Sequence, residues 1–223
     1  MPLVSSMSLL RSAFRLPLWS LLAALVLAPA VGFAQDDLRS SFPGRRVGGG
    51  TRGECSARLL VHLVPESSVY APNSTLQIGL LEGPTATPKP LELQFRPMSG
   101  SRSNETSGLN LTSKDLPAST AGITLIRFEA LQVPTVWESS YRCGDGDINS
   151  TDPLQFVQTV SPPAVSLLVR DVQPADAGIQ IAIAEIRRYC GGTVPSAELA
   201  KAFDLGDVIT SDWPAQLPVR CPS

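Results

Sequence analysis

The sequence has few of the residues from which common catalytic and metal sites are built. Its 223 residues include one histidine, His62, and four cysteines, which form no C-x-x-C pair. A tetrahedral zinc site takes four such ligands, commonly in closely spaced pairs, so the chain lacks the ligands for one. The G-x-S-x-G motif of α/β-hydrolases is missing as well. His62 lies in a predicted strand without an oriented nucleophile beside it, and we expect it to have a structural role.

Long apolar segments are missing after residue 34. Before that point, Arg11 and Arg15 precede an apolar run, and Gly32-Phe33-Ala34 places small residues where a signal peptidase requires them. Residues 1–34 are therefore predicted to be a signal peptide that is cleaved after Ala34. The apolar run is shorter than the about 20 residues that a transmembrane helix needs. We expect export to the periplasm or extracellular space, with no stable membrane insertion after cleavage.

The chain also has no excess of basic charge. Signal cleavage would remove two of the 18 basic residues and none of the 20 acidic ones, which leaves a formal charge of −4. A mildly acidic protein is a poor match for the phosphate backbone of a nucleic acid. Nucleic acid is therefore not expected as a partner.

Four cysteines are present, and their even number predicts disulfides in an exported chain. They are Cys55, Cys143, Cys190 and Cys221, which allow three connectivities. We favour Cys55–Cys143 and Cys190–Cys221. The first bond would close a loop of about 88 residues and stabilise the fold by about 4 to 5 kcal/mol in the loop-entropy model.

Residues 55–172 mostly follow the period of two that is typical of β-strands. Leu91, Leu93 and Phe95 alternate with polar residues, whereas residues 123–128 carry apolar residues on both faces, as in a central strand. Turns rich in Pro, Gly, Ser and Asn separate about seven such segments, and no helical crossovers lie between them. We therefore predict a mainly β protein, with an immunoglobulin-like β-sandwich of about seven strands over residues 55–172.

Residues 173–223 show different signals and are predicted to be a helical and irregular extension. Pro174 and Asp176 are typical of a helix start, and Arg187 and Arg188 are typical of a helix end. The alternative is a strand, because residues 166–178 resemble the corner between two strands of an immunoglobulin domain. We favour the helix, and a second short helix is expected over about residues 195–205.

The stretch GRRVGGGTRGEC, residues 44–55, contains a G-x-x-x-x-G-x-T pattern. A phosphate-binding P-loop has Lys before the Thr, but the residue here is Gly50. No aromatic residue alternates with the arginines, as a platform for single-stranded nucleic acid would require. Residues 35–54 are thus predicted to be a flexible Gly/Arg leader before Cys55. Its three consecutive glycines suggest a close backbone approach to a partner or to the edge of the domain itself.

The segment CGDGDINSTD offers one candidate metal site. The candidate ligands are Asp145, Asp147, Asn149 and Asp152, and their spacing resembles part of the calcium loop of dockerin modules. Tyr141 and Cys143 stand at the first and third positions of that loop, where carboxylates would be needed. Calcium is therefore a possible but incomplete match, and an acidic turn after a strand is the alternative.

Several of these motifs together resemble a family of exported cyanobacterial proteins that is defined only as a domain of unknown function (number 928). The stretch over residues 44–55 carries most of the resemblance, and residues 63–66 and 121–128 add to it. The resemblance covers roughly residues 43–172, and the match is poor beyond Val172. It implies an exported protein, and it implies no catalytic residues.

The expected function is a non-enzymatic binding or interaction module whose partner is an envelope protein or a glycan. This expectation rests on a sandwich with polar loops, which is an analogy at the level of the fold. One alternative is a carboxylate-dependent hydrolase that uses Glu66 with Asp145 or Asp147. The other is a structural module that calcium stabilises.

Overall fold

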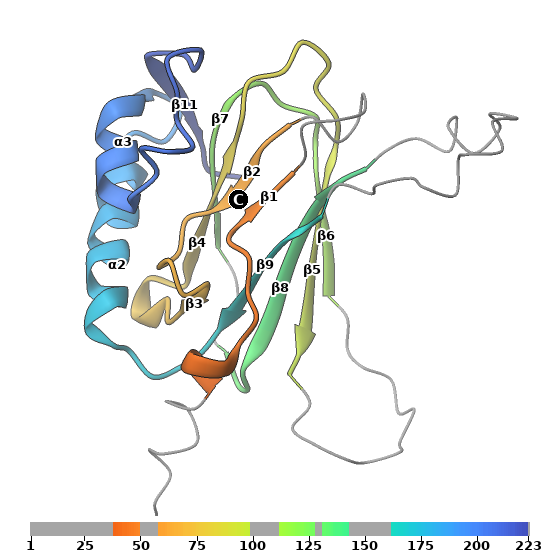
Figure 1. Ribbon diagram of the computed structural model, residues 1–223, viewed down its shortest axis with the longest axis vertical. Helices are drawn as coiled ribbons and strands as arrows, with labels where there is room; N and C mark the ends of the chain where they lie inside the picture. Colours follow the sequence, from red (N-terminus) through yellow and green to blue (C-terminus); the bar gives the residue numbers. More distant parts are fainter. Residues whose placement is uncertain (1–37, 50–57, 99–111, 128–130, 143–161, 223) are drawn as a thin grey trace, which may run out of the picture.

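The computed structural model describes residues 38–49, 58–98, 112–127, 131–142 and 162–222. These residues form a mainly β protein with two mixed sheets and few helices (Figure 1). The prediction of a mainly β chain is therefore confirmed at this level. No described helix is long and apolar enough to cross a membrane.

The first sheet has six strands in the order β1-β2-β4-β7-β11-β10. Its neighbouring strands are antiparallel except for the parallel pair of β7 and β11. The strands are β1 (Val47–Gly48), β2 (Leu60–His62), β4 (Gln77–Glu82), β7 (Gly122–Arg127), β10 (Thr193–Pro195) and β11 (Gln216–Arg220).

The second sheet has five strands in the order β3-β9-β8-β5-β6. Only its edge pair of β3 and β9 is parallel. The strands are β3 (Val69–Tyr70), β5 (Leu91–Pro97), β6 (Thr112–Leu116), β8 (Thr135–Tyr141) and β9 (Ala164–Leu168).

Two α-helices follow β9, as the favoured interpretation of the sequence predicts. They are α2 (Pro174–Arg187) and α3 (Ser196–Phe203), and the short 3-10 helix η1 (Asn73–Thr75) lies between β3 and β4. A capping box between Gln173 and Asp176, with Pro174 in the first turn, starts α2. The isoleucines of α2 that repeat at helical spacing are buried, so tertiary packing selects the helix over the strand.

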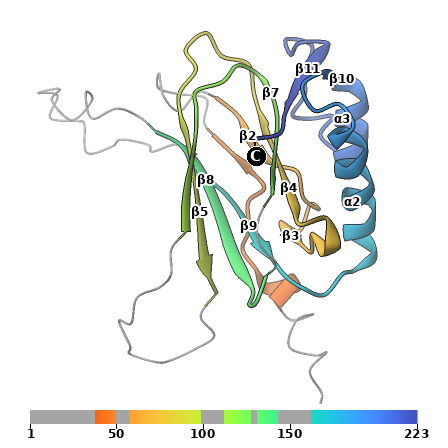
Figure 2. The same cartoon turned by 180° about the vertical axis from the view of Figure 1, so that it is seen from behind.

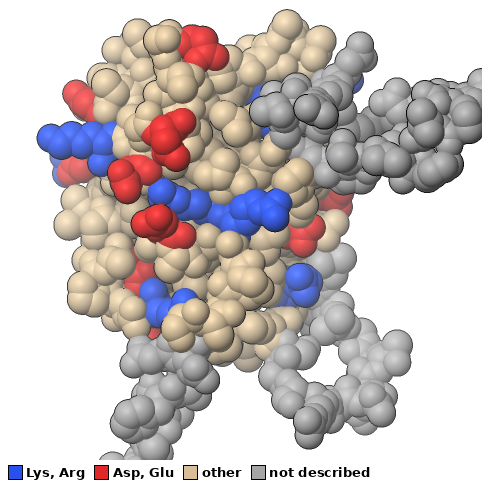
Figure 3. Space-filling model, in the orientation of Figure 1, with Lys and Arg blue, Asp and Glu red and all other residues tan. Residues whose placement is uncertain are grey.

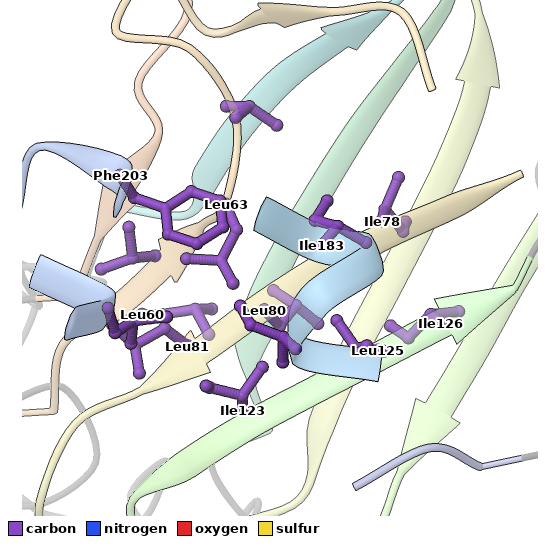
Figure 4. Packing of buried hydrophobic residues seen from close by; sticks show 14 of the residues in the cluster. Leu60, Leu63, Ile78, Leu80, Leu81, Ile123, Leu125, Ile126, Ile183 and Phe203 are labelled. Carbon is purple, nitrogen blue, oxygen red and sulfur yellow. The ribbon is translucent and has the colours of Figure 1, made fainter. Parts of the chain in front are cut away.

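The six-stranded sheet is covered on both faces. Helices α2 and α3 lie along one side of it, and the five-stranded sheet lies on the other side (Figures 1 and 2). All six residues of β4 are buried, and so are five of the six in β7. Side chains from both helices and from β2, β4 and β7 form one continuous apolar cluster (Figure 4). This double burial explains why residues 123–126 are apolar at nearly every position.

The register of the strands identifies the two faces. Val61, Leu81 and Ile123 are paired across β2, β4 and β7, so their side chains share one face. The neighbouring row, which contains His62, lies on the opposite face. Because His62 contacts Ser139 and Ser166 of the five-stranded sheet, its row faces that sheet, and the row of Val61 faces the helices.

The C-terminal segment is part of the six-stranded sheet. Strand β11 pairs with β7 through Val219 and Arg220, and β10 pairs with the other side of β11. The predicted division between a sandwich over residues 55–172 and an appended extension over 173–223 therefore does not match a boundary in the fold. Pro218 has no backbone N–H, so it interrupts the row of hydrogen-bond donors in β11. For this reason the sequence of this strand looks irregular.

The leader is built into the fold over residues 38–49. Strand β1 pairs with β2, while Arg45 exchanges two backbone hydrogen bonds of 2.8 Å with Val165 of β9. The leader thus bonds to both sheets, and the prediction that it is flexible is wrong for these residues. Residues 50–54 lie outside the described part of the chain.

The glycines of the leader allow this close packing. A Cβ atom on Gly48 would collide with the backbone of Ala164, and one on Gly49 would collide with the carbonyl oxygen of Arg58. Gly49 also has a φ of +92°, which side-chain-bearing residues rarely adopt. The glycine run is therefore explained, as far as Gly49, by approach to the edge of the chain's own domain.

Arg46, also in the leader, binds the end of a distant helix. Its Nη1 donates to the carbonyl oxygen of Phe203 at 2.9 Å, and its Nη2 donates to that of Asp204 at 3.0 Å. These carbonyls lie at the C-terminal end of α3, where backbone oxygens lack helical partners and favour a positive charge. The guanidinium therefore caps α3.

The disulfide between Cys190 and Cys221 is present, with a Cα–Cα distance of 5.7 Å. It joins the chain just after α2 to the chain just after β11, so it links the helical layer to the sheet. This half of the predicted pairing is confirmed. Cys55 and Cys143 lie outside the described residues.

Candidate functional site

The predicted calcium ligands lie outside the described residues. This applies to Asp145, Asp147, Asn149 and Asp152 alike. Within the described ranges, no group of three or more His, Cys, Asp or Glu side chains is arranged to hold a metal ion. Glu66, the described member of the predicted carboxylate pair, is exposed after β2. The calcium site and the carboxylate pair stay predictions.

His62 lies at the centre of a closed polar cluster between the two sheets. Its Nδ1 is 2.8 Å from Oγ of Ser166, and its Nε2 is 2.9 Å from Oγ of Ser139. Its ring stacks on that of Trp137, with a centroid distance of 3.5 Å and an interplanar angle of 5°. All four side chains come from strands whose inward positions face each other.

This cluster is built for structure. His62, Ser139 and Ser166 are all fully buried, so no substrate reaches them. Burial lowers the pKa of His62 well below its ordinary value, which keeps the ring neutral. A neutral imidazole donates from one nitrogen and accepts at the other, and a serine hydroxyl can serve either role. His62 therefore links the two sheets through its hydrogen bonds to β8 and β9.

The outer face of the five-stranded sheet is different, because polar side chains gather on it. Leu91, Leu93 and Trp137 point inward and are buried. The residues that alternate with them point outward and are at least partly exposed. We call this outward set the open face; it consists of Glu92, Gln94, Ser113, Asp115, Glu138 and Ser140.

The strand register places the residues of the open face in two rows. Glu92 lies between Asp115 of β6 and Ser140 of β8. In the next row, Gln94 lies between its partners Ser113 and Glu138. Directly opposite residues have Cβ atoms about 5 Å apart, so the side chains within a row can act on the same ligand.

Hydrogen bonds order part of the open face. Oε1 of Glu92 accepts bonds from Nε2 of Gln94 at 3.1 Å and from Oγ of Ser113 at 3.2 Å. Glu92 and Asp115 are like charges in directly opposite positions, which would repel each other. Nη2 of Arg142 relieves this repulsion, since it donates to Oδ1 of Asp115 at 2.8 Å, and its Nε lies 3.9 Å from Glu92. These contacts hold the acceptor oxygens of Glu92 and Asp115 in place.

The rest of this outer surface is covered by the leader. Val136 and Leu167 are buried there, with Leu38, Phe42 and Met98 packed against their cluster. The open face therefore has an apolar border beside its polar rows. Such a surface suits a ligand that donates hydrogen bonds, such as a compound rich in hydroxyl groups.

Sequence reasoning identified the alternation of β5 but not the open face. Glu92 and Gln94 were recognised as the outward positions of a strand. Their neighbours in β6 come from the Ser- and Thr-rich region before residue 121, which lacks the alternating apolar pattern of a strand. The short TSKDL segment is the part of the sequence that forms β6. Its strand structure depends on pairing with β5, so the segment by itself gives a weak signal.

Surface charge alone does not identify a binding surface. On the face that Figure 3 shows, acidic and basic side chains are interspersed among uncharged residues. No protein-family model matches the chain, and neither a curated protein nor a solved structure is significantly similar to it. The resemblance to the cyanobacterial family therefore stays a prediction from the motifs.

Proposed function

We propose that the protein is an exported, non-enzymatic binding module of the cell envelope whose ligand binds to the open face. One observation carries the proposal: the six-stranded sheet has both faces covered, whereas the five-stranded sheet exposes ordered polar side chains. Ordered acceptors reduce the entropy that a ligand must overcome on binding. Export rests on the predicted signal peptide over residues 1–34, with a periplasmic or extracellular destination.

The core architecture belongs to the same proposal. The two sheets share a hydrophobic cluster, which supports a β-sandwich. In its more specific form, the proposal is that this sandwich is immunoglobulin-like. The parallel pairs β3–β9 and β7–β11 depart from the antiparallel sheets of that fold.

The ligand class that fits best is a glycan. The open face carries carboxylates at Glu92, Asp115 and Glu138, which accept hydrogen bonds and donate none when ionised. Sugar hydroxyls are abundant donors of such bonds. Gln94 and Ser113 can exchange their internal bonds for bonds to a sugar, so they can report on binding without removing a charge.

Binding to envelope polysaccharide tests this function. The full chain, exported and purified, is incubated with isolated envelope polysaccharide and sedimented. The double variant Gln94→Ala/Ser113→Ala is expected to lose most of the sedimented fraction. The matched control is Glu198→Gln on α3, an exposed position on the opposite side of the six-stranded sheet, which should leave binding unchanged.

Two results would count against the proposal in different ways. If the wild-type chain does not sediment with any envelope glycan, the glycan class is wrong. A photo-crosslinker at Ser113 in the intact envelope then asks whether a protein occupies the open face. If no crosslink forms there either, the open face is not the binding surface.

A further inference from the structure

A second polar cluster lies at one end of the space between the sheets. It contains Arg58 just before β2, Glu82 at the end of β4, Ser119 between β6 and β7, and Arg220 at the end of β11. Tyr141 of β8 lies beneath it, with the Arg58 guanidinium 5.1 Å from the centre of its ring. We call this set the arginine–glutamate cluster. It is separate from the open face.

Glu82 occupies the centre of the arginine–glutamate cluster. Nη1 of Arg58 lies 3.0 Å from its Oε1, and Nη1 of Arg220 lies 3.7 Å from its Oε2. Oγ of Ser119 donates to the same Oε2 at 2.5 Å. The remaining bonds go to backbone: Nε of Arg58 donates to the carbonyl of Gly83, and Nη2 of Arg220 donates to that of Thr120, each at 2.7 Å.

The cluster contains more positive than negative charge. Among the described residues, two guanidinium groups, which stay charged in proteins, face one carboxylate. Arg58 is 5% exposed and Glu82 is 2% exposed, so water compensates little of the difference. Burial also raises the pKa of Glu82. A buried charge without a partner is strongly unfavourable, so a counter-charge is expected at this place.

The cluster also contains more donors than acceptors. Nη1 and Nη2 of Arg58 and Nη1 of Arg220 are shielded from solvent, and none of these three donor groups makes a hydrogen bond to a described residue; among the acceptors of the cluster, Oε1 of Glu82 is in the same position. The Arg58 guanidinium pairs with Oε1 of Glu82, and the Arg220 guanidinium lies near Oε2. A partner that satisfies them must accept hydrogen bonds and carry negative charge. Both requirements describe an anion.

We propose that the arginine–glutamate cluster binds a small monovalent anion, chloride or a carboxylate of formate size, between the guanidinium groups of Arg58 and Arg220. The Arg220 side chain is 29% exposed, so the cluster reaches the surface on that side. We expect a small ion because protein encloses the Arg58 side chain. We expect a monovalent ion because the cluster has an excess of one positive charge. Through its ionic interactions, the bound anion links β11 to β4 and to the start of β2.

Thermal unfolding of the full chain tests the proposal. The melting temperature is measured in sodium chloride, sodium formate and sodium gluconate at one ionic strength, because gluconate is too large for the site. It should rise with chloride or formate and level off at high concentration, as expected for ligand binding to the folded state. Whichever of the two gives the lower half-saturating concentration is the better match for the site.

Two variants and a control make the test specific. Arg220→Gln should remove the difference between chloride and gluconate, whereas Arg188→Gln, at an exposed arginine just after α2, should retain it. Glu82→Gln raises the surplus to two charges, so the half-saturating concentration should fall several-fold. A purely structural role for Glu82 would lower the melting temperature without this change.

Three results would overturn the proposal. The first is an equal melting temperature of the wild-type chain in all three salts. The second is a difference between salts that persists in Arg220→Gln. If Arg220→Gln does not fold, Glu82→Gln decides: an unchanged or higher half-saturating concentration for this variant is the third contrary result.

Discussion

The two sheets differ in how many of their faces are covered, and this difference separates stability from the proposed recognition. In the six-stranded sheet, β4 is buried at all six positions because helices and the other sheet enclose it. In the five-stranded sheet, the N-terminal half of β5 alternates between buried leucines and partly exposed polar residues. Substitutions in the first sheet should therefore change the free energy of unfolding. Substitutions on the open face should change binding.

The polar residues follow the same division. His62 is neutral, buried and bonded to two serines, so it contributes to packing between the sheets. Glu92 and Asp115 accept hydrogen bonds at the surface, where a ligand can replace their partners. The same side-chain chemistry has a structural role in one place and can have a recognition role in the other because water reaches only the second.

The largest effect is expected from Ile183→Ala in the helical cover. Ile183 is fully buried in the main cluster, so the truncation should lower the free energy of unfolding by about 4 kcal/mol. Ile181 on the same helix is 66% exposed, and Ile181→Ala should cost less than about 0.5 kcal/mol. Urea denaturation measures both. Equal effects would show that α2 does not cover the sheet as described.

Gly49→Val should break the junction between the leader and the domain. The new side chain would need a positive φ and would collide with the carbonyl of Arg58, which together cost about 3 kcal/mol. Gly206→Val is the matched control, because a Cβ there meets nothing within 4 Å and its φ is not positive. Amide hydrogen exchange should show faster exchange in β1 for Gly49→Val only. Unchanged exchange in β1 would contradict the role assigned to Gly49.

His62→Phe should lower the free energy of unfolding by about 2 kcal/mol at pH 7.5, because it leaves two buried hydroxyls without their partner. The pKa of His62 is lowered in the folded state, so below pH 6.5 only the unfolded state binds the extra proton. The wild type thus loses stability on acidification, by about 1.4 kcal/mol between pH 7.5 and 5.5 from this group.

The variant lacks this titration. Its stability deficit relative to wild type should therefore shrink by about 1.4 kcal/mol over the same range, and guanidinium denaturation at both pH values measures the change. A constant deficit would show that His62 is protonated in the folded protein or accessible to water.

The smallest effect on stability is expected from Gln94→Ala on the open face. The side chain is partly exposed and its bond to Glu92 is replaceable by water, so unfolding should change by less than about 0.5 kcal/mol. Its effect on sedimentation with polysaccharide should be larger than its effect on stability. If Gln94→Ala lowers the stability but leaves binding unchanged, the roles assigned to the two sheets are contradicted.

Local sequence patterns were sufficient for the central elements. Alternation identified β5, the apolar run identified β7, and helix-end signals identified α2. The Cys190–Cys221 bond also followed from the cysteine arithmetic, although other connectivities were possible. These features depend on residues that are close in sequence or on a covalent bond with few alternatives.

Long-range pairing was harder to predict. Strand β1 has two residues, one of them Gly48, so it shows no side-chain pattern and exists only through β2. Strand β11 contains Pro218 and depends on β7, about a hundred residues earlier. The ion pair of Arg58 and Glu82 likewise arises from chain folding. Their cause is tertiary contact, which overrides local propensity.

The cap that Arg46 places on α3 determines when the fold can be completed. Its acceptors at Phe203 and Asp204 are 157 and 158 residues further along the chain. The leader therefore emerges early in synthesis, but these partners become available only after almost all described elements have been synthesised. Contacts of such high sequence separation make folding slow.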